Sequence, residues 1–435
     1  MSKALSTYLK LNIFKGDKGI WMIYFLLCMI SLVAIYSASS ALTFRSGNHW
    51  DPVVHQAAFL LIGLLVIMAI TRVPCKYFKL LPIIFLPIVI GMLVYMLTVQ
   101  KGINDAARWM DLFGIRFQPS EMAKTFLILA IAVVLSKMQK EEKVHTKRGV
   151  RYVIRATKGG HAKAFKIVGL LALLICGLIA PENFSTAAML FFVVLVMMFI
   201  GNIPIGLMLK GLGALFAIAA LGVVVLLNTP DESLEGLKRA RTWKHRIEKK
   251  LGHEESMQEE QNYLTADENR QVYRSHIAIA NSGIIGVGVG NSVERDFLPH
   301  AESDFIFSII VEETGVIGAL IVMFLYLALL VRVGRIAQKC DRFFPAFLVI
   351  GLGLMMVLQA LVNMAVAVGW APVTGQTLPL ISHGGTSIII TSFNLGMILS
   401  VSRYAEIVSA KKAEETPEIE GVVDAEEIAS SEGMA

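Results

Sequence analysis

Residues 305–331 read FIFSIIVEETGVIGALIVMFLYLALLV, an apolar run whose charged side chains are those of Glu312 and Glu313. A run of this length can cross the hydrocarbon core of a bilayer as an α-helix, and similar blocks recur along the 435-residue chain. The mean hydropathy is +0.63. Only 17% of the residues are charged, against roughly a quarter in soluble proteins. This composition excludes a soluble globular enzyme.

The apolar blocks predict an all-α, polytopic membrane protein with about ten transmembrane helices and one large extracytoplasmic loop. Pro181-Glu182-Asn183 divides residues 166–201 into two spans, because a lipid-facing helix tolerates such a polar interruption poorly. We expect a cytoplasmic segment 1–19, a membrane domain 20–403 with the loop 229–304, and a disordered acidic cytoplasmic tail 404–435. The expected spans are 20–42, 55–71, 79–98, 120–136, 166–182, 185–201, 206–228, 305–331, 344–368 and 385–402.

The short connections that are rich in Lys and Arg all fall on one side of this predicted membrane. They are the N-terminal segment and the connections around residues 72–79, 137–166 and 332–342. Because basic short connections stay in the cytoplasm, we expect both termini to be cytoplasmic in a multi-pass protein of the cytoplasmic membrane. The long loop 229–304 is also basic, but loops above about 60 residues are exempt from this rule.

A first polar cluster lies at the start of the fourth span. Glu121 and Lys124 are three residues apart, so they share one helix face and can neutralise each other as a structural ion pair. Alternatively, Lys124 and Arg108 face a buried anionic ligand, and Trp109 provides an interfacial platform for a sugar or a lipid chain. Both interpretations remain open at this point.

A second cluster surrounds the mouth of the eighth span. Asp304 precedes the apolar run, where partial desolvation would suit its carboxylate to proton abstraction. An Asp in this position is also an ordinary helix N-cap. Glu312 and Glu313 lie within the span, where acidic side chains need a partner, a cavity or an ion. For these two, hydrogen bonding within the helix bundle is the favoured interpretation.

Two further segments, one rich in Gly and Pro and one rich in basic residues, lie between the predicted spans. Gly and Pro residues prevent a regular helix through 369–388, which predicts a structured loop, and Gly384-Gly385 leaves backbone amides free to meet an anion. The basic run 238–250, which includes Arg241, reads either as an amphipathic helix on anionic lipids or as a pyrophosphate clamp. No nucleic-acid partner is expected, since this run is predicted to be extracytoplasmic.

Together these blocks resemble the SEDS family (shape, elongation, division and sporulation), the polytopic membrane glycosyltransferases that build peptidoglycan. The resemblance covers nearly the whole chain up to Arg403. The segments Gln376–Pro379 and Leu399–Arg403 look more like the division branch of the family than the elongation branch. The motifs that carry the resemblance are Arg108-Trp109, Gln118-Pro119-Ser120-Glu121 to Lys124, Leu298-Pro299 to Phe307, Glu312-Glu313-Thr314-Gly315, Asn363 to Gly369, Pro372-Val373-Thr374-Gly375 and Ser382-His383-Gly384-Gly385-Thr386-Ser387.

The resemblance implies a glycosyltransferase that polymerises lipid II into glycan strands on the outer face of the membrane, at the division septum. Asp304 would be the general base. A divalent cation, Mg²⁺ or Mn²⁺, would suit this chemistry, but no ligand set can be read from the sequence. The implied partners are lipid II, the nascent glycan strand, a cognate class B penicillin-binding protein (a transpeptidase), other divisome proteins and membrane lipids. The implied substrate contacts are Arg108, Trp109, Glu121, Lys124, Arg241, Gly384 and Gly385.

Three motifs depart from the family pattern. The family's Gln-Pro-Asp-x-Gly-Thr reads here as residues 181–186, Pro-Glu-Asn-Phe-Ser-Thr, and His383 stands in place of the tyrosine of Ser-Tyr-Gly-Gly-Ser-Ser. The third departure lies just before Asp304. The family's Leu-Pro-Glu-x-His-Thr-Asp-Phe reads here as residues 298–305 with Glu302 in place of the histidine and His300 in place of the glutamate. Any role of that histidine therefore does not carry over, whereas Asp304 keeps its place.

Two other function classes remain as alternatives to the enzyme. In a lipid II flippase, Lys124, Glu312 and Glu313 would line a translocation path. A non-catalytic divisome scaffold would need none of these groups. Asp304 on the outer side favours the enzyme, because neither transport nor scaffolding needs a general base there.

Overall fold

The computed structural model describes residues 14–39, 50–98, 110–112, 115–146, 149–156, 159–229, 267–298 and 301–432. Arg108, Trp109, Arg241 and His300 lie outside these ranges.

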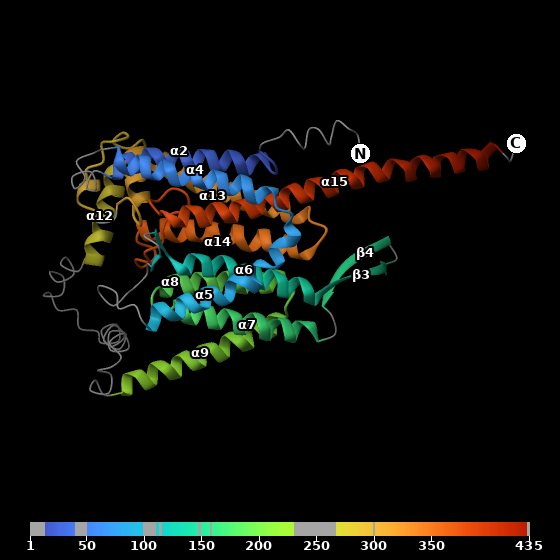
Figure 1. The fold of residues 1–435 in the computed structure, drawn as a ribbon, viewed down its shortest axis with the longest axis horizontal. Coiled ribbons are helices and arrows are strands. Elements are labelled where there is room, and N and C mark those ends of the chain that lie inside the picture. The colour runs from blue at the N-terminus through green and yellow to red at the C-terminus, as the bar shows by residue number, and fades with distance from the viewer. Residues whose placement is uncertain are drawn as a thin grey trace.

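Each of the ten predicted spans corresponds to a helix. The ten helices are α2 (Lys18–Ala38), α4 (Asp51–Arg72), α5 (Leu81–Thr98), α6 (Pro119–Met138), α7 (Gly160–Ile179), α8 (Phe184–Ile200), α9 (Ile205–Asn228), α13 (Ile306–Gln338), α14 (Phe343–Ala367) and α15 (Thr386–Glu432). They run side by side in one bundle, except that α9 diverges from the others at one edge (Figure 1). Seven of the described helices are long and apolar enough to cross a membrane, including the Thr386–Ala410 part of α15. Among the rest, α8 and the Ile205–Ala217 part of α9 are shorter apolar helices. An all-α polytopic membrane fold is thereby confirmed.

Two antiparallel β-ribbons were not predicted. Strand β1 (Met110–Leu112) pairs with β2 (Ile115–Phe117), just before α6. Strand β3 (Gln139–Thr146) pairs with β4 (Gly149–Ala156), between α6 and α7. The second ribbon lies in the basic connection 137–166, where β-branched and aromatic residues in 150–154 favour extended structure.

The structure also has helices in two segments where none was predicted, the large loop and the C-terminal tail. Within the large loop 229–304, residues Asp267–Ser282 form α12 and Glu294–Asp296 form the 3-10 helix η4. Helix α15 continues to Glu432 and extends beyond the other helices in Figure 1, whereas we expected disorder from residue 404. The acidic composition favoured disorder, but the Ala, Glu and Lys residues after Arg403 are also strong helix formers.

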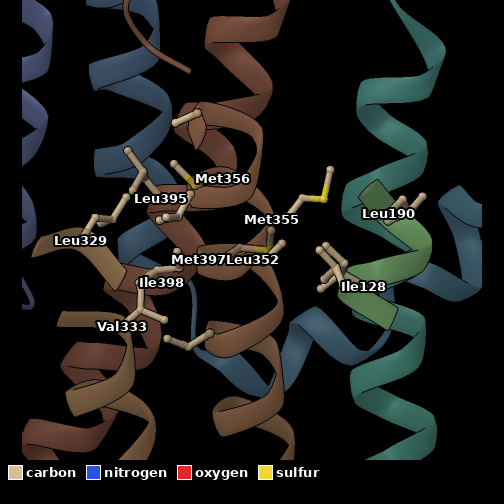
Figure 2. Packing of buried hydrophobic residues seen from close by; sticks show 14 of the residues in the cluster. Ile128, Leu190, Leu329, Val333, Leu352, Met355, Met356, Leu395, Met397 and Ile398 are labelled. Atoms are coloured by element: carbon tan, nitrogen blue, oxygen red, sulfur yellow. The ribbon is translucent and has the colours of Figure 1, made fainter. Parts of the chain in front are cut away.

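Helix α14 is the central helix of the bundle. Of its apolar stretch, 67% is buried, close to the 72% of the Thr386–Ala410 part of α15 and far above the 22% of α4. Its side chains lie between those of α6 and α8 on one side and those of α13 and α15 on the other (Figure 2). The labelled residues are Ile128, Leu190, Leu329, Val333, Leu352, Met355, Met356, Leu395, Met397 and Ile398.

Helix α13 is kinked at Gly315, which has φ 68° and ψ −167°. The segment that follows α12 packs against this kink. Its backbone N–H groups donate to α13 carbonyls that the kink leaves without partners inside the helix. Val287 N donates to Glu312 O (3.0 Å) and Gly288 N to Glu313 O (3.0 Å). A Cβ atom at Gly315 would lie 2.2 Å from the carbonyl oxygen of Ile284. The kink therefore requires glycine, for both its positive φ and the close backbone approach.

We predict that Gly315→Ala lowers the free energy of unfolding by more than about 2 kcal/mol, because the left-handed conformation and the clash both penalise a methyl group. The measurement is thermal or denaturant unfolding of the purified chain in detergent. Gly169→Ala in α7 is the matched control, since a Cβ atom there meets nothing within 4 Å. An equal, small effect of both substitutions would contradict the structural requirement at Gly315.

Candidate active site

Residues 369–385 form an irregular connection between α14 and α15, here called the inner loop. Gly369, Gly375, Leu380 and Gly385 all have positive φ, and Leu378 and Ile381 are buried. This confirms the predicted structured, non-helical segment. Trp370 at its start is exposed, but residues 374–382 are buried or half-buried in the bundle, so the backbone polar groups of this part need protein partners.

The bundle supplies these partners from helices that are remote in sequence. Tyr326 of α13 donates its hydroxyl proton to the carbonyl of Pro379 (O–O 2.5 Å). Ser31 Oγ of α2 donates to Ile381 O (2.9 Å), and Gln56 Nε2 of α4 donates to Ser31 Oγ (2.8 Å). Ser31 and Gln56 are fully buried. Three helices thus fix one half of the inner loop.

The other half of the inner loop is held by two amides of α14. Gln359 Nε2 donates to Thr377 O (3.0 Å), and Asn363 Nδ2 donates to Gln376 O (2.7 Å). The Gln376 side chain in turn donates to Thr186 Oγ1 of α8. Each of these groups satisfies a backbone or side-chain acceptor that would otherwise be buried without a partner.

Asp304 lies directly beside the inner loop. Asn363 Nδ2, which bonds to Gln376, also donates to Asp304 O (2.8 Å). Asp304 is half-buried, and the next residue, Phe305, is completely buried. Phe305 is the N-cap of α13. Asp304 is therefore not the N-cap, which was the alternative role considered for it. One amide therefore positions both the segment that carries Asp304 and the inner loop.

Two further hydrogen bonds join the same segments. Ser382 Oγ donates to Ser303 O (2.6 Å), and His383 N donates to Glu302 O (2.9 Å). Burial lowers the pKa of His383; the charge of Glu302 opposes this effect and that of His55 adds to it. His383 is therefore neutral near pH 7, and Glu302, which replaces the histidine of the family motif, lies against the inner loop.

Glu121 and Lys124 form the structural ion pair that was one of the two alternatives. Lys124 Nζ lies 2.6 Å from Glu121 Oε1, and their side chains are 3% and 8% exposed. Lys124 Nζ also donates to Gln359 Oε1 (2.8 Å). Gln359 donates to Thr377 O through its other amide atom. The ion pair is therefore connected to the inner loop through the Gln359 side chain.

Gly384 and Gly385 lie at the end of the inner loop, where α15 begins. The adjacent Thr386 Oγ1 donates to Arg116 O of β2 (3.0 Å), so the β1–β2 ribbon lies next to this end of the loop. Arg116 forms an exposed ion pair with Asp111 of β1 (3.3 Å). Of the predicted site residues, the structure thus gathers Asp304, the Glu121–Lys124 pair and the two glycines around one loop.

Glu312 and Glu313 are hydrogen-bonded within the bundle, as the favoured interpretation predicted. Glu312 accepts from Ser292 Oγ and from Val293 N (3.1 Å), and Glu313 accepts from Ser37 Oγ of α2. Both side chains are buried. Glu312 thereby connects the segment after α12 to α13, and Glu313 connects α2 to α13.

Sequence reasoning did not identify Ser31, Gln56, Tyr326, Gln359 or Thr186. Each is a polar side chain within an apolar span, and that signal could have marked them. The sequence does not show, however, which of many such polar residues point toward the same loop.

The divalent cation remains a prediction. Within the described residues, no group of three or more His, Cys, Asp or Glu side chains could hold a metal ion. Mg²⁺ is often held by only one or two carboxylates together with water and substrate phosphates, so this finding leaves the prediction open.

We predict that Lys124→Met lowers the free energy of unfolding by about 3–5 kcal/mol, because it leaves the Glu121 carboxylate buried without its partner. The double variant Lys124→Met/Glu121→Gln should recover part of this loss. Unfolding in detergent measures both. Lys137→Met, at the exposed end of the same helix, is the control and should be nearly neutral; a loss at Lys124 no greater than at Lys137 would refute the structural ion pair.

Comparison with known proteins agrees with this architecture. The FtsW/RodA/SpoVE family of cell cycle proteins matches residues 17–407. The chain is 31% identical over 405 residues to a probable peptidoglycan glycosyltransferase FtsW of Enterococcus hirae, covering 89% of this chain and 93% of the relative. It is 30% identical over 381 residues to one of Marinobacter nauticus, covering 86% of each chain.

Two solved structures share the fold. One belongs to a study of how a peptidoglycan synthase complex coordinates polymerization and crosslinking (TM-score 0.65, 25% identity, covering 89% of this chain and 98% of the other). The other is RodA, the rod shape determining protein of Thermus thermophilus (TM-score 0.60, 24% identity, covering 89% and 97%). The resemblance to the SEDS family, and to its FtsW-like division branch, is confirmed. The chain belongs to the FtsW/RodA/SpoVE family of cell cycle proteins.

Proposed function

We propose that this chain is a peptidoglycan glycosyltransferase that polymerises lipid II into glycan strands during cell division. The observation that carries the proposal is the placement of Asp304, half-buried and held through its backbone by Asn363 beside the inner loop. FtsW relatives of similar length carry the name probable peptidoglycan glycosyltransferase. General-base catalysis needs a carboxylate that is held near the substrate, and here the backbone that carries the Asp304 carboxylate is fixed.

In the proposed reaction, the Asp304 carboxylate accepts the proton of the acceptor sugar hydroxyl. The hydroxyl oxygen bonds to the anomeric carbon of the donor, and the bond from that carbon to the undecaprenyl pyrophosphate breaks, with its electron pair leaving on the pyrophosphate. Cationic groups stabilise the departing anion. Arg108 and Arg241 keep this predicted role outside the described residues, and the backbone amides at Gly384 and Gly385 are candidates within them.

The Glu121–Lys124 pair has a positioning role in this proposal. Lys124 is buried and already bonded to Glu121 and Gln359, and Gln359 holds the inner loop at Thr377. The pair therefore acts through the loop and does not itself need to contact pyrophosphate. A flippase would use Lys124, Glu312 and Glu313 along a path, but each of these is engaged in hydrogen bonds inside the bundle.

We predict that Asp304→Asn polymerises purified lipid II at least about a hundredfold more slowly than the wild type, because the amide cannot accept the proton. Gel analysis of glycan products measures the rate. Asp296→Asn in η4, whose side chain is 57% exposed, is the matched control and should retain activity. If the Asp304 variant polymerises at close to the wild-type rate, the general-base assignment is wrong, and the flippase and scaffold alternatives gain.

We also propose the orientation that the basic connections predict, with both termini in the cytoplasm and residues 229–304 outside. A single cysteine introduced as Glu255→Cys should react with a membrane-impermeant maleimide in intact spheroplasts. Lys412→Cys should react only after lysis, and the chain without either substitution sets the background from its four native cysteines. Reaction at position 255 only after lysis would reverse the orientation.

A cognate class B transpeptidase is the proposed partner at the septum, alongside other divisome proteins. The likeness to a chain from a synthase complex that couples polymerization to crosslinking supports this partnership. We predict that a saturating amount of the cognate transpeptidase raises the polymerisation rate severalfold, including when its own active-site serine is replaced. Equal rates with and without the partner would count against a functional complex.

A further inference from the structure

A cavity of about 270 Å³ lies at the end of the bundle opposite to the inner loop. It is formed by the connection after α4, including the 3-10 helix η1 (Cys75–Lys79), by the first residues of α14 and by α15 near residues 400–407. Helix α14 begins at this cavity and ends at the inner loop, and α15 runs back between the same two places. The cavity is therefore separate from the site around Asp304.

Four cationic side chains line this cavity, namely Lys76, Lys79, Arg342 and Arg403. Its lining includes no Asp or Glu, and none of the four cations forms an ion pair with another described residue. Arg403 Nε is buried without a hydrogen-bond partner among the described residues. Arg403 is half-buried and its Nη1 donates to Thr71 O (3.4 Å), but the buried Nε lacks an acceptor, which a bound anion would supply.

Two further cations, Lys15 and Arg72, lie near Arg403. Burial lowers the pKa of Lys15, and the charges of Arg403 and Arg72 lower it further. These cations are brought together from the N-terminal segment, the end of α4 and α15, so their mutual repulsion opposes packing of the bundle. A bound anion would remove that repulsion.

The rest of the lining is apolar and lies near the ends of helices that are long enough to span a membrane. Phe344, Pro345 and Ile407 line the cavity beside the cations. Just beyond η1, the α5 residues Ile83 and Ile84 are 67% and 58% exposed. Such a surface suits acyl chains, whereas a site for a free anion does not need one.

We propose that this cavity binds the phosphate headgroup of an anionic phospholipid. The volume lies below the roughly 300–1,000 Å³ of typical small-molecule pockets, so the headgroup enters and the acyl chains lie outside against α5. Lys79, whose Nζ lies 5.1 Å from the centre of the Phe344 ring, and Arg403 contribute two of the charges. The lipid thereby connects η1, α14 and α15.

The test uses the full chain purified in detergent and titrated with phosphatidylglycerol, with phosphatidylcholine or with inorganic phosphate, each read by native mass spectrometry and by thermal stability. We expect phosphatidylglycerol to bind and to raise the melting temperature, since a ligand of the folded state stabilises it. Arg403→Gln and Lys79→Gln should each weaken this binding roughly fivefold, because one surface cation contributes about that factor.

Arg335→Gln is the matched control, because Arg335 is an exposed cation in the last turn of α13 that does not line the cavity. It should leave lipid binding unchanged. If Arg403→Gln does not fold, Lys79→Gln decides the outcome. Equal binding of the two lipids, or equal losses in the Arg335 and Lys79 variants, would overturn the proposal. If inorganic phosphate raises the melting temperature as much as phosphatidylglycerol does, the cavity is a site for a free anion and the lipid proposal is wrong.

Discussion

Residues 374–382 of the inner loop place irregular backbone inside an apolar helix bundle, and this is the constraint to which the rest of the structure responds. Each buried carbonyl in such a loop costs free energy unless it is hydrogen-bonded. Here Ser31, Tyr326, Gln359 and Asn363 donate to inner-loop carbonyls from three different helices. Polar side chains that would otherwise be unfavourable in transmembrane helices are retained for this purpose.

This arrangement couples the candidate base to the centre of the bundle. Asn363 bonds to both Asp304 O and Gln376 O, so the two backbones cannot move independently. Gln359, one helical turn earlier in α14, connects the same loop to the Glu121–Lys124 ion pair. The interactions that keep the loop folded are therefore also those that fix the position of Asp304.

The sequence predicted the features that depend on composition along the chain. Apolar blocks located all ten helices, and Gly and Pro residues located the inner loop. It could not predict the features that depend on which side chains meet across the bundle, such as the bond from Tyr326 to the inner loop or the burial of Lys124 against Gln359. Helical continuation of α15 to Glu432 was missed because the same acidic composition fits both disorder and helix.

The bond between Ser31 and Ile381 joins residues that are 350 positions apart. At a synthesis rate of about 5–20 residues per second, roughly 20–70 s pass between the appearance of the two partners on the ribosome. During that interval the first two spans have no inner loop to bind. The hydrogen bond from Gln56 to Ser31 connects α2 and α4 directly and needs no later part of the chain. These two polar side chains can therefore remain hydrogen-bonded to each other within the membrane until the C-terminal third of the protein is inserted.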